Sequence, residues 1–183
     1  MKDEFAHLHV HTEYSLLDGS NKIKEYVARV KELGMNSAAI TDHGVMYGVI
    51  DFYREAKSQG INPILGCEVY VAPNSRFDRE VTGGEDRYYH LVLLAENNEG
   101  YANLMKIVSK GFVEGYYYKP RVDKELLRKY HSGIIALSAC LAGEVSRYLM
   151  KGLYDEAKKS CVGVQRYLWK RSFLFRTAGS RSA

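Results

Sequence analysis

Apolar and polar positions alternate along the chain with two different periods. Short apolar runs bounded by glycine, asparagine and aspartate are followed by longer stretches in which apolar residues recur every three or four positions. The short runs are typical of buried strands, and the longer stretches are typical of amphipathic helices. Repeated strand-then-helix units indicate helices packed around a parallel sheet. The pattern therefore predicts an α/β fold.

The same pattern gives the expected bounds of the elements. Ser20 is the expected N-cap of the first helix and Gly34 its C-terminal stop, and Asn97 is the expected cap of a later helix. The polar, glycine-bearing segment 74–87 is typical of an exposed excursion. We expect strands at residues 5–10, 37–41, 61–71, 89–95 and 133–138, and helices at residues 20–34, 49–58, 97–111, 124–129, 141–150 and 153–159.

Length and composition exclude several classes of protein. The chain has 183 residues, 46% of them hydrophobic and 26% charged, which is enough for one globular domain with a buried core and excludes a disordered chain. No apolar run approaches the ~20 residues of a membrane helix, and the first residues lack the pattern of a signal peptide. We therefore predict a cytoplasmic protein without membrane contact. Three cysteines are too few for a disulfide framework, so a thiolate is available as a metal ligand.

The net charge of +4 is unevenly distributed. Residues 160–183 contain five basic residues and no acid, whereas residues 1–159 contain 21 basic and 22 acidic residues. The body of the chain is therefore close to neutral. Net charge gives no support for nucleic-acid binding.

The first candidate chemistry is a pair of histidines at the end of the first expected strand. Residues two apart in a strand point to the same face, so His9 and His11 can present their imidazoles to one ion. Asp18 follows on the next loop and can add an oxygen ligand. His7 is expected on the same face of the strand as this pair. It can hydrogen-bond to a metal ligand and orient it, although we favour a role in packing.

Other expected strand ends also carry residues of the ligand type. In α/β folds the loops at the carboxyl ends of parallel strands converge, so these side chains are expected to meet. Glu68 interrupts an apolar run, where an unpaired carboxylate is costly to bury. Asp42 can orient a ligand or form a turn before Gly44, and the two interpretations stay open. The residues in question are His43, Glu68, His90 and Cys140.

These types of ligand restrict which metal ions the site can bind. Histidine, carboxylate and thiolate together favour zinc, manganese or iron over magnesium and calcium, which prefer oxygen ligands. Several such ions can hold a phosphate ester and activate water, so a hydrolytic site needs no side-chain nucleophile. Cys67 is expected to be a small core residue. The aromatic and basic run 116–121 is open to two interpretations, stacking on single-stranded DNA or packing against another domain.

These motifs together resemble a known family. The segments that carry the resemblance are HVH (9–11) with Asp18, TDHG (41–44), GCE (66–68), YHL (89–91) and LSACLAGE (137–144). They resemble the PHP (polymerase and histidinol phosphatase) superfamily. Residues 5–19 and 138–144 and the KPR segment at 119–121 are similar, more closely, to the N-terminal PHP domains of bacterial DNA polymerase III alpha subunits. The resemblance covers residues from about 5 to about 159.

The resemblance implies a fold, a site and a function. The fold would be a distorted seven-stranded β/α barrel, similar to a TIM barrel and incomplete at its C-terminus here. The site would hold up to three ions in a complete domain and fewer here, because the family's last two ligands, an Asp-x-His pair, have no counterpart before Ala183. The implied metal is zinc, or else manganese or iron. The implied ligands are His9, His11, Asp18, His43, Glu68, His90 and Cys140, supported by Asp42 and His7.

The implied function is DNA replication by a polymerase, a nucleotidyltransferase. In that protein the PHP domain would act as a metal-dependent phosphoesterase with 3′→5′ exonuclease activity, or would stabilise the polymerase. The expected partners are DNA, other replisome subunits and the polymerase body. Two alternatives stay open. One is a free-standing PHP phosphoesterase of the histidinol-phosphatase type, and the other is a non-catalytic structural module.

The last 24 residues differ from the rest of the chain. They are free of acids, and the end of the segment is polar and aperiodic where family members have a strand. Residues 166–182 can be written in codons whose one-base shift reads DICGKEVFYLELQDHG, which resembles that strand. We therefore predict a PHP metal-binding domain at residues 1–159 and a tail at 160–183 in a non-native reading frame.

Overall fold

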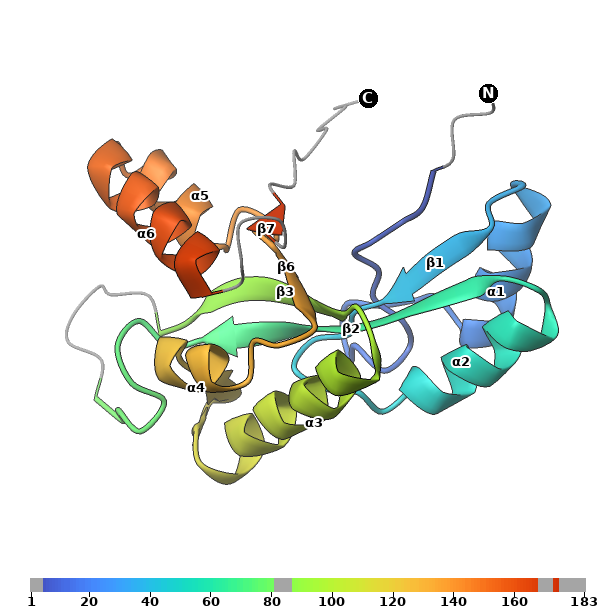
Figure 1. Cartoon of the computed structure of the whole chain (residues 1–183), viewed down its shortest axis with the longest axis horizontal. Helices are drawn as coiled ribbons and strands as arrows, with labels where there is room; N and C mark the ends of the chain where they lie inside the picture. Colours follow the sequence, from blue (N-terminus) through green and yellow to red (C-terminus); the bar gives the residue numbers. More distant parts are fainter. Residues whose placement is uncertain (1–4, 81–86, 168–172, 175–183) are drawn as a thin grey trace.

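The computed structural model describes residues 5–80, 87–167 and 173–174. Their strands pair in the order β4-β5-β2-β3-β6-β7, and β1 pairs with β2 (Figure 1). The strands are β1 Ser37–Ile40, β2 Asn62–Val71, β3 Tyr89–Ala95, β4 Tyr116–Tyr117, β5 Lys119–Val122, β6 Ile134–Leu137 and β7 Phe173–Leu174. The mixed α/β class predicted from the pattern is confirmed.

Six helices surround this sheet in the described part of the chain. They are α1 Ile23–Glu32, α2 Val49–Ser58, α3 Asn98–Val113, α4 Lys124–Lys129, α5 Glu144–Met150 and α6 Tyr154–Tyr167. Figure 1 shows α1 and α2 at one end of the sheet, α3 and α4 below it, and α5 with α6 at the other end. The boundary expected between residues 159 and 160 falls inside α6. No helix among the described residues has the length and apolar character needed to cross a membrane.

The sheet is mixed, so the prediction of a parallel sheet is wrong. β2 is parallel to β1 and β5, but β3 is antiparallel to both of its neighbours, β2 and β6. Apolar periodicity does not distinguish the two directions when both faces of a strand are covered. The direction of β3 matters for the site, because it brings the beginning of β3 beside the second half of β2.

The seven-stranded barrel is not confirmed. β4 and β7 stand at the two ends of the pairing order and do not pair with each other among the described residues. Residues 5–10, expected to be a strand, run beside β1 without forming a regular one. Ala39 N donates to His7 O at 3.0 Å and Thr41 N to Val10 O at 2.8 Å. The two acceptor carbonyls are three residues apart, whereas the two donor amides, in and directly after β1, are only two residues apart. Residues 5–10 therefore contain one residue too many to form a regular parallel ladder with β1.

The helix ends show which local signals were read correctly. Asn97 caps α3 by accepting a hydrogen bond from Gly100 N, and Gly34, after α1, has φ +73°. Ser20 is not the N-cap of α1, because the helix begins after Lys22, which makes no side-chain cap. The helix expected from residue 141 begins at Glu144.

The β4-β5 hairpin is an element that the apolar pattern does not predict. Tyr117 pairs with Lys119, so Tyr118 alone forms the turn, with φ +62°. Its strands are two and four residues long and mix aromatic with charged residues, which leaves no alternation to detect. Two main groups of buried side chains hold the elements together. One lies between the sheet and α3 and α4, and the other between β1 and α1 and α2.

Candidate metal centre

Glu68 lies at the centre of a cluster of histidines. Its side chain is 1% exposed, and its Oε2 atom lies 2.8 Å from His9 Nε2 and 2.9 Å from His11 Nε2. The same oxygen lies 3.5 Å from His43 Nδ1, and Glu68 Oε1 lies 2.7 Å from His90 Nδ1. The carboxylate that interrupts an apolar strand is therefore surrounded by four imidazoles.

The parallel pairing of β1 and β2 places His43 beside this carboxylate. The pairing continues past the end of β1, where His43 and Glu68 form an isolated parallel bridge. Glu68 N donates to Asp42 O at 3.0 Å, and Gly44 N donates to Glu68 O at 2.8 Å. The backbone thus fixes the histidine against the middle of β2.

His90 reaches the cluster from the beginning of a strand. It is the second residue of β3 and pairs with Tyr70, two residues after Glu68. Its backbone N donates to Ala142 O at 3.0 Å, which draws the loop after β6 toward the site. Cys140 lies on that loop, with its Sγ atom 3.8 Å from His90 Nδ1. His43 and Cys140 follow the carboxyl ends of β1 and β6, as expected. His90 instead lies at the beginning of β3, and it reaches the same edge of the sheet because β3 is antiparallel to its neighbours.

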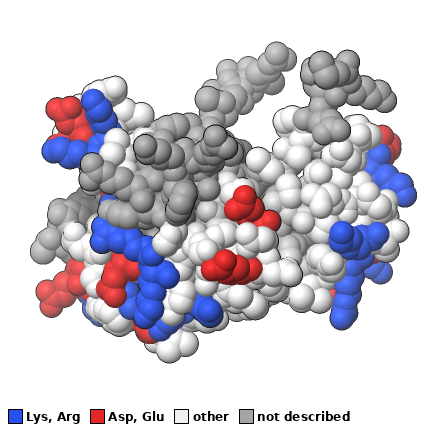
Figure 2. All heavy atoms as spheres, in the orientation of Figure 1, with Lys and Arg blue, Asp and Glu red and all other residues white. Residues whose placement is uncertain are grey.

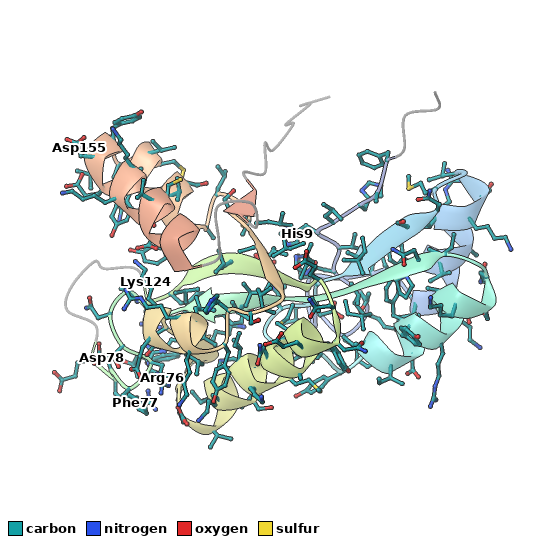
Figure 3. All side chains as sticks on the ribbon, in the orientation of Figure 1. His9, Arg76, Phe77, Asp78, Lys124 and Asp155 are labelled. Atoms are coloured by element: carbon teal, nitrogen blue, oxygen red, sulfur yellow. The ribbon has the colours of Figure 1, made fainter. Side chains whose placement is uncertain are left out.

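The irregular segment before residue 12 supplies the other histidines. The rings of His9 and His11 meet edge to face at 4.9 Å, and the His11 ring stacks on His43 at 4.0 Å. Asp18 Oδ2 lies 2.8 Å from His43 Nε2, and its side chain is 57% exposed. His9 lies over the middle of the sheet in Figure 3. A cavity of about 460 Å³ borders His9, His11 and Asp18 and is also lined by Arg29.

Three overlapping groups of these side chains have spacings suited to a metal ion. Within each group the candidate ligand atoms lie within 4.8 Å of one another. The groups are His9, His11 and Glu68; His11, Asp18 and His43; and His43, Glu68 and His90. Six of the seven ligand candidates belong to these groups, and Cys140 meets the cluster at His90.

The contacts in the cluster shift its proton affinities. Burial opposes ionisation of Glu68, but its close contacts with His11, His9 and His90 hold the pKa of this carboxyl well below its usual range. Burial also opposes protonation of His90, but its contacts with Cys140 and Glu68 raise the pKa of His90 to about 9. Burial, and then the neighbouring His11, lower the pKa of His43. The contact with His90 lowers the pKa of the Cys140 thiol.

Two buried donor atoms indicate that the cluster fits a metal. His43 Nδ1 and Glu68 Oε1 have no hydrogen-bond partner in the part of the chain that the structure describes. The 2.7 Å contact between Glu68 Oε1 and His90 Nδ1 is an ion-pair distance without hydrogen-bond geometry. Buried polar atoms without partners are costly, and coordination removes that cost. Imidazole, carboxylate and thiolate are all donors that transition metals accept.

Asp42 supports the site through a buried hydrogen-bond network. Its Oδ1 atom accepts from Thr12 N at 2.6 Å and Ser15 Oγ at 2.7 Å, and its Oδ2 atom accepts from Thr12 Oγ1 at 2.7 Å. Ser15 Oγ also accepts from His43 N at 3.1 Å. Asp42 therefore ties the loop after His11 to the turn that carries His43. Sequence reasoning missed Thr12 and Ser15, because short hydroxyl residues in a loop carry no periodic signal.

The remaining sequence candidates lie around this centre. His7 is exposed and its ring contacts Phe5 at 4.8 Å, so it neither packs in the core nor belongs to the three ligand groups. Cys67 is fully buried, as expected of a core residue, and burial raises the pKa of its thiol. Arg121, from the aromatic and basic run, is 2% exposed and binds backbone carbonyls.

Comparison with known proteins identifies the family of this chain. The PHP domain family matches residues 7–175, most of the chain. The chain therefore belongs to the PHP domain family.

Individual relatives show which members of this family the chain resembles. The chain is 50% identical over 155 residues to the DNA polymerase III subunit alpha of Treponema pallidum, which covers 85% of this chain and 13% of the relative. It is 51% identical over 166 residues to that of Helicobacter pylori (strain ATCC 700392 / 26695), again covering 85% and 13%. It is 48% identical over 175 residues to that of Deinococcus radiodurans, covering 92% and 13%. The chain thus has strong homology to the PHP region of these subunits and spans about an eighth of their length.

Two solved structures also show similarity. One is an amidohydrolase from Chromobacterium violaceum, with 25% identity and a TM-score of 0.40 over 57% of this chain and 34% of that chain. The other is described as a metal-dependent phosphoesterase from Bifidobacterium adolescentis. It has 14% identity and a TM-score of 0.40 over 98% of this chain and 57% of that chain.

Proposed function

We propose that this chain is the PHP region of a DNA polymerase III alpha subunit and that its metal centre hydrolyses phosphodiester bonds in DNA from the 3′ end. The observation that supports the proposal is the gathering of six ligand-type side chains in three overlapping groups around the buried Glu68. The homology to polymerase subunits supports DNA as the substrate and other replisome subunits as partners.

The donor set favours zinc, with manganese or iron as alternatives. Imidazoles dominate the three groups, and Cys140 adds sulfur next to His90. The ligands would be His9, His11, Asp18, His43, Glu68, His90 and Cys140. Because the groups share members, neighbouring ions would share ligands, and a complete domain would hold up to three. When bound, such ions lower the pKa of water and neutralise charge on a phosphate.

The chain's own residues prepare the centre for that role. Glu68 holds four imidazoles in place while it is shielded from solvent. Asp42, with Ser15 and Thr12, orients the backbone that carries His11 and His43. The cavity beside His9 and Asp18 leaves space for a phosphate and the sugar attached to it. A preorganised donor cluster next to an open cavity is the arrangement that metal-assisted hydrolysis requires.

The proposal is tested by hydrolysis with two substrates. The full chain, loaded with zinc or manganese, is incubated with a primer carrying a 3′ mismatch and separately with histidinol phosphate. We expect the primer to be shortened, and we expect His9→Ala to abolish this activity. The matched control is His131→Ala, because His131 Nδ1 contacts Arg128 O at 2.7 Å and the side chain belongs to none of the three groups.

The alternatives predict other outcomes. Hydrolysis of histidinol phosphate but not of the primer would indicate a small-molecule phosphatase. A metal-loaded chain that is stabilised by the metal but hydrolyses neither substrate would indicate a structural module. Equal activity of His9→Ala and wild type would remove the assigned site.

We also propose that residues 160–183 are encoded in a shifted reading frame. The supporting observation is the acid-free composition of this segment and the family-like strand that a one-base shift produces from it. Sequencing the gene downstream of the Lys159 codon is the test. An open frame that continues into the Asp-x-His pair after a one-base shift is expected, and the absence of such a frame would contradict the proposal.

A further inference from the structure

A group of tyrosines adjoins the candidate metal centre on the side of His43 and His90. Tyr70 is 4% exposed, and its ring stacks parallel to His43 at 6.1 Å and meets His90 edge to face at 5.3 Å. Tyr88 contacts Tyr70 at 4.9 Å and stacks parallel to His90 at 6.0 Å. Tyr88 is partly exposed, so the aromatic wall continues from the ligands toward solvent.

Cations lie on this wall. Lys119 Nζ lies over the Tyr70 ring, 5.5 Å from its centroid, so the same ring contacts both the ammonium and the imidazole of His43. The neighbouring Tyr118 is 60% exposed and carries the Arg87 guanidinium at 4.2 Å from its centroid. On the face shown in Figure 2, lysine and arginine are intermixed with acids and form no large patch of one sign.

The hairpin that carries Tyr118 and Lys119 is firmly anchored. Arg121 is buried beneath it, with its guanidinium 4.9 Å from the Tyr117 ring centroid, and its Nη2 atom donates to Arg76 O and Asp78 O. In Figure 3, Arg76 and Asp78 lie beside α4, away from His9. The anchor therefore holds the hairpin through residues that are not candidate metal ligands.

The turn itself is costly. Tyr118 has φ +62°, a conformation that costs a non-glycine residue about 1 kcal/mol or more. A large aromatic side chain is thus held in a strained turn, is mostly exposed to water, and lies beside the Arg87 guanidinium. The next residue, Lys119, contacts the Tyr70 ring that stacks on His43. Within the described residues the Tyr118 ring contacts Tyr117, edge to face at 4.7 Å, and the Arg87 guanidinium, but these contacts leave most of the side chain exposed.

We propose that Tyr88, Tyr118 and Lys119 form a subsite that binds the nucleotide next to the scissile phosphate in single-stranded DNA. This proposal rests on the proposed function. The subsite would make the metal centre select a polynucleotide. A nucleobase stacks on an exposed tyrosine, and the Lys119 ammonium neutralises the flanking phosphate. A small phosphate monoester has no second phosphate to reach Lys119, so the subsite favours DNA over such substrates.

Binding of a fluorescein-labelled dT12 oligonucleotide tests the subsite. Anisotropy is measured with the full chain in EDTA, so that hydrolysis does not occur, at several salt concentrations. We expect Lys119→Ala to weaken binding and to reduce the slope of log affinity against log salt by about 0.7, the value for one phosphate contact on a single strand. Lys119→Arg is expected to restore the slope. Tyr118→Ala is expected to weaken binding about tenfold.

Lys106→Ala is the matched control. Lys106 Nζ lies 5.6 Å from the Tyr130 ring centroid, which is the same kind of contact, but Tyr130 packs against the core near α3 and α4. This variant should bind dT12 like wild type. Thermal unfolding of each variant shows whether a loss of binding reflects a loss of folding. If Lys119→Ala unfolds, Tyr118→Ala decides the test, and wild-type affinity of that variant would contradict the subsite.

Two results would overturn the subsite. One is a wild-type chain that does not bind dT12, and the other is a Lys119→Ala chain with the affinity and salt slope of wild type. The second result would leave packing against another domain as the role of the hairpin. Failure of the metal-loaded wild type to shorten a primer would count against the proposed function alone, because the binding measurements decide the subsite independently.

Discussion

Ser15 Oγ donates a hydrogen bond of 2.7 Å to Asp42 Oδ1 and accepts one of 3.1 Å from His43 N. Both Ser15 and Asp42 are buried, with 1% exposure each. One hydroxyl therefore connects the loop after His11 with the turn that carries His43. The contact explains how two segments without regular structure can keep the His11 and His43 rings stacked on each other.

Asp42→Asn tests this network. The amide replaces one acceptor oxygen by a donor that faces Thr12 or Ser15, so a buried donor loses its partner. We expect the free energy of unfolding to fall by about 2 to 3 kcal/mol, because hydrogen bonds to a charged group are involved. Urea denaturation measures the change.

Asp51→Asn is the control for that substitution. Asp51 is an exposed acid in the first turn of α2, where it contributes about 0.5 kcal/mol through the helix dipole. Equal losses of stability in the two variants would show that the Asp42 network does not hold the site together.

Asn97→Ala tests the cap of α3. Asn97 Oδ1 accepts a hydrogen bond from Gly100 N at 2.9 Å, and the loss of such a cap costs about 1 kcal/mol. The neighbouring Asn98 is exposed and is the first residue of the helix, so Asn98→Ala should be neutral or slightly stabilising. Thermal or urea unfolding of the two variants makes the comparison. An Asn97→Ala variant as stable as wild type would contradict the assigned cap.

Arg121→Lys tests the anchor beneath the hairpin. A lysine cannot reproduce the fork that binds the carbonyls of Gly115, Arg76 and Asp78, so hydrogen bonds from a buried charged group are lost. We expect a loss of about 2 kcal/mol or more in the free energy of unfolding. Arg54→Lys, at an exposed position on α2, should change it by less than about 0.5 kcal/mol. Similar values for both variants would show that the buried fork is not needed.

The sequence predicts the elements with strong local signals. The bounds of α2, α4 and β3 match the expected ranges, because apolar periodicity agrees there with clear turn residues such as Gly60. The cluster of ligand types around Glu68 follows from a carboxylate in an apolar run. Burial of such a group demands partners, and the available partners are the histidines at neighbouring element ends.

Other features depend on long-range pairing and could not be read from local pattern. The direction of β3 and the one-residue mismatch between residues 5–10 and β1 are set by register between distant segments. The roles of Thr12 and Ser15 depend on a carboxylate about thirty positions away. The hairpin around Tyr118 is too short to show a period.

The most direct test of the central claim is the metal content of the purified chain after dialysis against zinc or manganese, measured by mass spectrometry. We predict that wild type and His131→Ala retain bound metal. We predict that His43→Ala, which removes a member of two of the three groups, retains less. A wild-type chain without metal, or a His43→Ala chain with the metal content of wild type, would contradict the assignment of this cluster as a metal centre.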